Sequence, residues 1–229
     1  MSVHEKYAII DTKGTIITPF IYDEMMNFYE GLASIKKEKK YGFIDKLGNE
    51  VIECVYDYVH DFSEGLAGVR KGRKYGFINK EGDIVIPCVY DQVNYFSEGL
   101  AGVVEDRKYG YIDKNGNPVI SFSYDYRFGF LNSFNDGLAA VWKNKRYGFI
   151  DPEENLIIPF IYNNFYGLSE GDLSVMKDAT GGFIDKKGDI VIPFIYSETR
   201  AFVDGLAQVW NWKDRSGYIN KEGVEYWED

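Results

Sequence analysis

The chain has 229 residues and a formal charge of −10, from 26 basic and 36 acidic residues. A negative field of this size argues against binding to nucleic acid or to an anionic membrane surface. No apolar run approaches the ~20 residues that a membrane-spanning helix needs, and the start, MSVHEKYAII, lacks the pattern of a signal peptide. With only two cysteines, Cys54 and Cys88, we expect a cytoplasmic protein.

A five-residue phrase recurs along the chain. It reads YGFID at 41–45, YGFIN at 75–79, YGYID at 109–113 and YGFID at 147–151. Weaker copies start at Tyr7, Gly181 and Ser216. The starts at 7, 41, 75, 109, 147, 181 and 216 are 34, 34, 34, 38, 34 and 35 residues apart. A fixed period in this range indicates a repeat architecture, so residues 1–229 are interpreted as one repeat domain of about six and a half units.

The segment from Gly65 to Glu98 shows the composition of one repeat. Its first predicted strand, 66–69, is rich in small residues, and the polar hairpin RKGRK leads to a second strand at 75–78. An Asx residue followed three places later by glycine, Asn79 and Gly82, predicts a tight turn with positive φ at the glycine. The same motif recurs in the other repeats and is lost only at residues 151–154, DPEE.

A third strand is predicted at 84–86, where it is followed by Pro87. Proline donates no ladder hydrogen bond, so this strand is expected at the outer edge of its sheet. The run from Val89 to Phe96 then crosses back to the next Gly-Leu-Ala and has room for a short fourth strand. In YGFI, alternation places Tyr and Phe on one face and Gly and Ile on the other, where glycine leaves room for a neighbour's side chain.

The predicted fold class is therefore all-β, with tandem ~34-residue repeats of three- to four-stranded antiparallel sheets. Two arrangements cover both faces of each sheet: a curved, propeller-like array, and an open β-solenoid or spiral. The small-residue first strand fits the crowded innermost position of a blade, which favours the propeller-like array.

Five linked sub-motifs recur in order: aromatic-Gly-aromatic-Ile-Asp, Lys-x-Gly, Val-Ile-Pro, Tyr-Asp and Phe-Ser-Glu-Gly-Leu-Ala. This pattern resembles the WG-repeat, or KWG-repeat, family of bacterial proteins over nearly the whole chain. The tryptophan of the family name is replaced by Tyr41, Tyr75, Tyr109 and Tyr147. The resemblance implies a bacterial β-repeat protein with a binding or scaffolding role, and it implies no catalytic residue or cofactor.

The residues that carry common chemistry are sparse. The two histidines, His4 and His60, are far apart and have no cysteine cluster at metal-ligand spacing, so no metal site is predicted. No phosphate-binding glycine loop is present. Acidic residues recur with the period, as at Asp45 and Glu64, and turn capping explains them better than a pair of catalytic carboxylates. The sequence therefore predicts no enzyme, no catalytic residue and no cofactor.

Function is best sought where the repeat pattern breaks. An aromatic insertion around Phe128 lengthens one spacing to 38 residues, and the tryptophans all lie in the later half. These features are either packed scaffold or exposed contacts. As contacts, they define a candidate interaction surface of Arg127, Phe130, Trp142, Trp210 and Trp212.

Two binding functions remain open. The first is a scaffold that binds a protein or peptide through a rim of variable hairpins. The alternative is a carbohydrate- or cell-wall-binding repeat protein that uses exposed aromatic rings, of which Trp210 and Trp212 would share one face if their strand stays extended.

Overall fold

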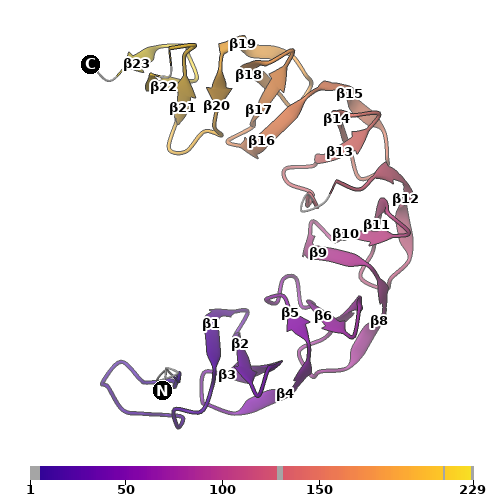
Figure 1. Ribbon diagram of the computed structural model, residues 1–229, viewed down its shortest axis with the longest axis vertical. Coiled ribbons are helices and arrows are strands. Elements are labelled where there is room, and N and C mark those ends of the chain that lie inside the picture. The colour runs from indigo at the N-terminus through magenta and orange to yellow at the C-terminus, as the bar shows by residue number, and fades with distance from the viewer. Residues whose placement is uncertain (1–5, 128–130, 214, 228–229) are drawn as a thin grey trace. The chain divides into compact units, whose positions relative to one another are not determined.

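The computed structural model describes residues 6–127, 131–213 and 215–227, and these residues form strands and turns without any helix (Figure 1). The chain divides into two compact units, residues 1–122 and 123–229. The predicted all-β fold of tandem antiparallel sheets is confirmed. The described sheets contain four strands each, apart from one with three.

In the first unit, a short segment with isolated antiparallel bridges, Tyr7 to Tyr22 and Ile10 to Ile16, precedes three sheets. The last strand of the third sheet crosses the boundary between the units. The first sheet contains β1 Glu24–Tyr29, β2 Leu32–Lys37, β3 Lys40–Asp45 and β4 Glu50–Tyr56. The second contains β5 Tyr58–Val59, β6 Ala67–Lys71, β7 Lys74–Ile78 and β8 Ile84–Tyr90. The third contains β9 Gln92–Ser97, β10 Leu100–Glu105, β11 Lys108–Ile112 and β12 Pro118–Asp125.

The second unit contains a three-stranded sheet followed by two four-stranded sheets. Its strands are β13 Ala139–Lys143, β14 Arg146–Ile150 and β15 Leu156–Tyr162; β16 Asn164–Ser169, β17 Asp172–Lys177, β18 Thr180–Asp185 and β19 Ile190–Tyr196; and β20 Glu198–Thr199, β21 Leu206–Trp210, β22 Ser216–Asn220 and β23 Glu225–Trp227.

Each four-stranded sheet is a simple antiparallel meander. The crossing segment does form the expected extra strand, and this strand lies at one edge of its sheet. We call β1, β5, β9, β16 and β20 the entry-edge strands. The small-residue strand therefore does not take the innermost edge, as the sequence had suggested, but lies second, between the entry-edge strand and the YGFI strand. Small residues suit this position because both of its neighbours approach closely.

The proline-containing strand occupies the opposite edge, as predicted, but it is longer than expected. Strand β8 runs through Pro87 to Tyr90 and pairs with β7 through Tyr75↔Tyr90 and Phe77↔Ile86. Three residues of β8 thus bulge opposite the single Gly76. Because β8 lies at the edge of the sheet, the missing N–H of Pro87 costs no hydrogen bond to a further strand.

This bulge explains the recurrent glycine of the YGFI phrase. A Cβ atom on Gly76 would lie 2.4 Å from the carbonyl oxygen of Ile86 and 2.7 Å from the backbone of Pro87. At Gly42 it would lie 2.3 Å from the carbonyl oxygen of Ile52. The glycine therefore makes room for the backbone of its own sheet, and the expectation that it admits a neighbour's side chain is wrong at these positions.

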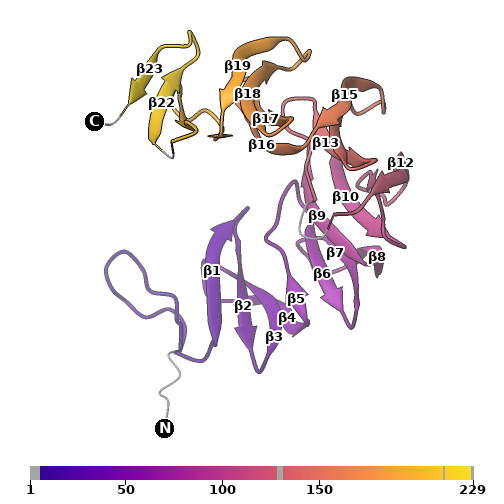
Figure 2. The ribbon, with the colours of Figure 1, turned by 45° about the horizontal axis from the view of Figure 1, so that its top comes forward.

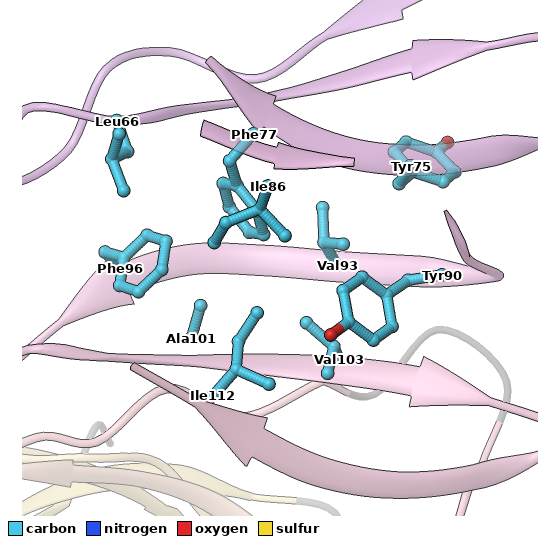
Figure 3. Close-up of a cluster of buried hydrophobic side chains, with 10 residues drawn as sticks. All are labelled: Leu66, Tyr75, Phe77, Ile86, Tyr90, Val93, Phe96, Ala101, Val103 and Ile112. Atoms are coloured by element: carbon cyan, nitrogen blue, oxygen red, sulfur yellow. The ribbon is translucent and has the colours of Figure 1, made fainter. Parts of the chain in front are cut away.

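Figure 2 shows the ribbons of the successive sheets of the first unit, and buried apolar side chains fill the space between consecutive sheets there. Phe77 faces the following sheet and Ile78 the preceding one, which confirms the alternation read from the sequence. The ring of Phe77 packs edge-on against Phe96, with centroids 4.8 Å apart. Figure 3 shows the layer between the second and third sheets, which contains Leu66, Tyr75, Phe77, Ile86, Tyr90, Val93, Phe96, Ala101, Val103 and Ile112.

The Asx turns close the outer hairpin of each sheet. In the turn that starts at Asp45, the carboxylate oxygen Oδ1 accepts the N–H groups of Leu47 and Asn49 at 2.9 Å, and Gly48 has a φ of 88°. The turn at residues 151–154 keeps the same geometry although its motif is missing, because Glu154 adopts a φ of 66° in place of glycine. The sequence thus loses the signal there without losing the turn.

Candidate functional site

The acidic residues that recur before Gly-Leu-Ala join neighbouring sheets. The Glu64 carboxylate accepts the N–H of Gly99, one repeat later, at 3.0 Å and pairs with Lys114 at 3.1 Å. In the same way Glu30 accepts the N–H of Gly65 at 3.1 Å and pairs with Lys80 at 3.0 Å. These acids cap the turn of the following repeat, so they are scaffold, as the sequence indicated.

In the first unit, the aspartate of the recurring Tyr-Asp motif engages the basic hairpins. Asp57 pairs with Lys40 at 2.5 Å and accepts the N–H of Gly72 at 2.7 Å. Asp91 pairs with Lys74 at 2.6 Å. Several lysines that gave these hairpins their basic character therefore serve contacts within the chain, and they form no free cationic rim.

Arg127 and Trp142 from the predicted interaction surface lie together. The guanidinium carbon of exposed Arg127 is 5.1 Å from the centre of the Trp142 ring, and the half-buried indole packs edge-on against Tyr147 at 4.6 Å. Burial raises the pKa of Tyr147, and the neighbouring Arg127 opposes this shift. Phe128 and Phe130 lie outside the described residues.

The two later tryptophans of that surface do not share a face. Strand β21 ends at Trp210, which is half-buried beneath the guanidinium of Arg200 at 5.4 Å. Trp212 lies in the following turn and is 63% exposed, and its indole N–H donates to the carbonyl of Ile195 at 3.2 Å. The condition for a paired tryptophan face, an extended strand through both residues, is not met.

A different group of aromatic side chains gathers on and beside the entry-edge strands β5 and β9 of the first unit. The ring of His60 lies 5.4 Å from that of Tyr58 and 4.9 Å from that of Tyr95. The guanidinium carbon of Arg70 lies 5.9 Å from the Tyr58 ring centre and 5.8 Å from that of Tyr75. Burial lowers the pKa of His60 to about 4, and its Nδ1 atom has no hydrogen-bond partner in the described structure. The imidazole is therefore neutral at physiological pH.

Next to this group lies a small cavity, here called the Asp61 pocket. It has a volume of about 220 Å³ and is lined by Tyr29, Asp61, Phe62, Ser63 and Tyr95. The two tyrosines are 47% and 41% exposed, whereas Phe62 is buried. Burial raises the pKa of Asp61 above its usual value, and a hydrogen bond with the Ser34 side chain partly opposes that shift. The pocket thus combines aromatic walls with a partly desolvated carboxyl group.

Two side chains of this pocket, Asp61 and Tyr95, stand at a position where the repeats differ. The position of Asp61 is held in the other ungapped repeats by Asn27, Tyr95, Gly167 and Ala201. By contrast, the position of Phe62 is always a large apolar residue, since it packs between sheets. The sequence analysis does not predict this pocket. The sequence feature that could have predicted the pocket is the period itself, because residues about one period apart lie side by side on neighbouring sheets.

The described residues contain no group of three or more His, Cys, Asp or Glu side chains placed to hold a metal ion. They also contain no helix long and apolar enough to cross a membrane. Cys54 and Cys88 are half-buried free thiols in the paired-strand bulges. Burial raises the pKa of Cys54 to about 11, so the thiol stays protonated at neutral pH.

The structure defines a β-repeat protein whose sheets are built like propeller blades. The family model of the WG containing repeat matches six consecutive segments, 7–41, 41–75, 75–109, 109–147, 147–178 and 182–209. The chain therefore belongs to the WG containing repeat family, which confirms the resemblance seen in the sequence. No curated protein sequence matches the chain.

Solved structures with a similar fold share little sequence with the chain. A eukaryotic initiation factor is 11% identical with a TM-score of 0.59, over 86% of this chain and 62% of that one. The computationally designed Ika8 protein is 10% identical with a TM-score of 0.57, over 93% and 78%. Hsv2p from Kluyveromyces lactis is 10% identical with a TM-score of 0.55, over 99% and 92%. At this identity the likeness shows the fold, which is of the propeller and β-repeat kind, and not a function.

Proposed function

We propose that the protein is a non-enzymatic interaction module that binds a protein or peptide partner through the entry-edge strands β1, β5 and β9. The observation that supports this most strongly is the gathering of Tyr29, Tyr58 and Tyr95, each 41–47% exposed. Tyr58 and Tyr95 stand at positions that differ between repeats, and Tyr29 replaces the serine of the Phe-Ser-Glu-Gly-Leu-Ala motif. Exposed tyrosines held by a rigid sheet offer a large contact area at a low cost in conformational entropy.

The edge strands add a second means of recognition. Each entry-edge strand pairs with a neighbour on one side alone within its own sheet. No second strand of the same sheet covers its outer side, which is the kind of edge to which an extended peptide adds a strand, and side chains at the variable positions would select the sequence of that peptide. The hairpin tips are weaker candidates, because lysines such as Lys40 and Lys74 already pair with Asp57 and Asp91.

A pull-down from the native host, followed by measurement with the purified partner, tests the proposal. The Tyr58→Ser/Tyr95→Ser variant is expected to lose affinity by about 100-fold, as expected for two aromatic anchors. Tyr226→Ser, which removes a 53% exposed tyrosine from β23, serves as the matched control and is expected to bind normally.

The hairpin-rim version of the hypothesis predicts the opposite result. If Arg127→Ala/Trp142→Ala abolishes binding while the Tyr58→Ser/Tyr95→Ser variant binds normally and remains folded, the entry-edge strands are not the interface. Circular dichroism and gel filtration of each variant distinguish a lost contact from a lost fold.

Carbohydrate binding is the second candidate function, and the exposure of Trp212 favours it. The indole is fixed by its hydrogen bond to Ile195 and is 63% exposed, as a ring that stacks on a sugar would be. A screen against glycans and cell-wall material tests this function. Saturable sugar binding that disappears in Trp212→Ala would support it, and the absence of any saturable sugar binding would reject it.

A further inference from the structure

Asp61 differs from the other acidic side chains around it. Glu30, Asp57, Glu64 and Asp91 each pair with a lysine at 2.5–3.1 Å. Among the described residues, no lysine or arginine lies within ion-pair distance of Asp61. A carboxylate that is partly removed from water and has no counter-cation gains more from an incoming positive charge than a solvated one.

The surroundings of Asp61 suit an organic cation. Tyr29 and Tyr95 come from entry-edge strands on either side of the one that precedes Asp61, and both rings line the same cavity of about 220 Å³. The electron-rich faces of tyrosine rings attract ammonium and guanidinium groups. Phe62 contributes apolar surface for the methylene groups of a long side chain.

A hydrogen bond between neighbouring repeats holds the pocket in shape. The hydroxyl of Ser63 donates to the carbonyl of Phe96 at 2.8 Å, which ties the segment after β5 to β9. Two of the residues that line the pocket, Ser63 and Tyr95, therefore keep a fixed spacing, and less entropy is lost on binding.

We infer that the Asp61 pocket receives a lysine or arginine side chain of the partner protein, with the charged group on Asp61 between the rings of Tyr29 and Tyr95. This inference rests on the proposed function and names the chemistry of the partner. The formal charge of −10 supports it, because an acidic protein attracts basic partners over a longer range. Neither a small apolar group nor a neutral sugar would compensate the negative charge of the Asp61 carboxylate.

Titrations with small probes, followed by NMR of the tyrosine rings, test the inference on the intact chain. The probes are the N-acetyl methylamides of lysine, arginine and norleucine, together with glucose. We expect saturable shifts of the Tyr29 and Tyr95 resonances with lysine or arginine, and no saturable shift with norleucine or glucose. Asp61→Asn is expected to weaken the binding of the cationic probe by about tenfold.

Glu81→Gln is the matched control, because it removes an exposed carboxylate with no ion pair in the described structure and should leave the titration unchanged. Tyr95→Leu is a second test variant, which keeps the apolar bulk and removes the ring face. The inference is overturned if norleucine or glucose shifts the same resonances equally, if Asp61→Asn binds as the wild type does, or if no probe gives a saturable shift. If any of these results is obtained and the affinity of the partner still falls in the Tyr58→Ser/Tyr95→Ser variant, the proposed function remains valid and only the inference about Asp61 is wrong.

Discussion

Replacing Gly76 by alanine is expected to destabilise the first unit by roughly 2–4 kcal/mol, although alanine is normally the better residue in a strand. The new Cβ atom would lie 2.4 Å from the carbonyl oxygen of Ile86, about 1 Å inside an ordinary contact. The obstacle is the backbone of the paired strand, which cannot rotate away as a side chain can. The bulge through Pro87 must retreat, and the ladder beside buried Phe77 is disturbed.

Gly82→Ala in the same sheet separates this effect from backbone strain. Gly82 has a φ of +89°, and its Cβ would meet Ile52 at an ordinary 3.4 Å. The expected cost is therefore the left-handed conformation alone, about 1 kcal/mol. Urea unfolding followed by circular dichroism and tyrosine fluorescence measures both variants against the wild type. A Gly76→Ala variant that is as stable as the wild type, or more stable than Gly82→Ala, would refute the account of the bulge.

Two further predictions concern charged groups. Glu64→Gln is expected to lower the free energy of unfolding by about 0.5–1 kcal/mol, because the carboxylate pairs with Lys114 and accepts the N–H of Gly99 at a partly exposed site. In urea titrations this difference should shrink in 1 M NaCl. A difference that salt leaves unchanged would contradict an electrostatic contribution of Glu64. His60→Asn is expected to reduce the loss of stability on acidification, because the pKa of His60 falls from 6.5 to about 4 on folding and the unfolded chain therefore binds more protons below pH 6.5. Between pH 7.5 and pH 5.0 the free energy of unfolding of the wild type should fall by about 2 kcal/mol more than that of the variant. Equal decreases for the two proteins in urea titrations would contradict the burial of a neutral imidazole.

Much of the fold could be predicted because it repeats. The period located every unit, alternation assigned Phe77 and Ile78 to opposite faces, and the positive φ expected at Gly48, Gly82 and Gly188 is observed at 88°, 89° and 92°. Each of these features depends on local chemistry, such as turn geometry or strand pleat. A single repeat therefore contains the information needed to predict it.

The remaining features depend on contacts between repeats or between paired strands. The role of Gly76 depends on how far β8 bulges, and alternation alone cannot report that. The clamp from Glu64 to Gly99 spans 35 residues, so the same glutamate looks like an ordinary turn residue within its own repeat. The turn at Glu154 was missed for a different reason: a non-glycine residue accepts positive φ there because the surrounding hydrogen bonds hold it.

The Asp61 pocket follows from the same geometry that makes the scaffold regular. A period of 34 residues places Asp61 and Tyr95 at equivalent points on neighbouring sheets, and Tyr29 joins them from the sheet before. In the segment that begins with β5, Val59 and Phe62 pack in the core between the first two sheets, whereas Asp61 lies outside that apolar cluster and lines the pocket. A change at Asp61 therefore alters what the surface can bind at little cost in stability. This separation of the two roles allows one repeat pattern to present different surfaces, because the period records the residues that repeat and carries no information about those that differ between repeats.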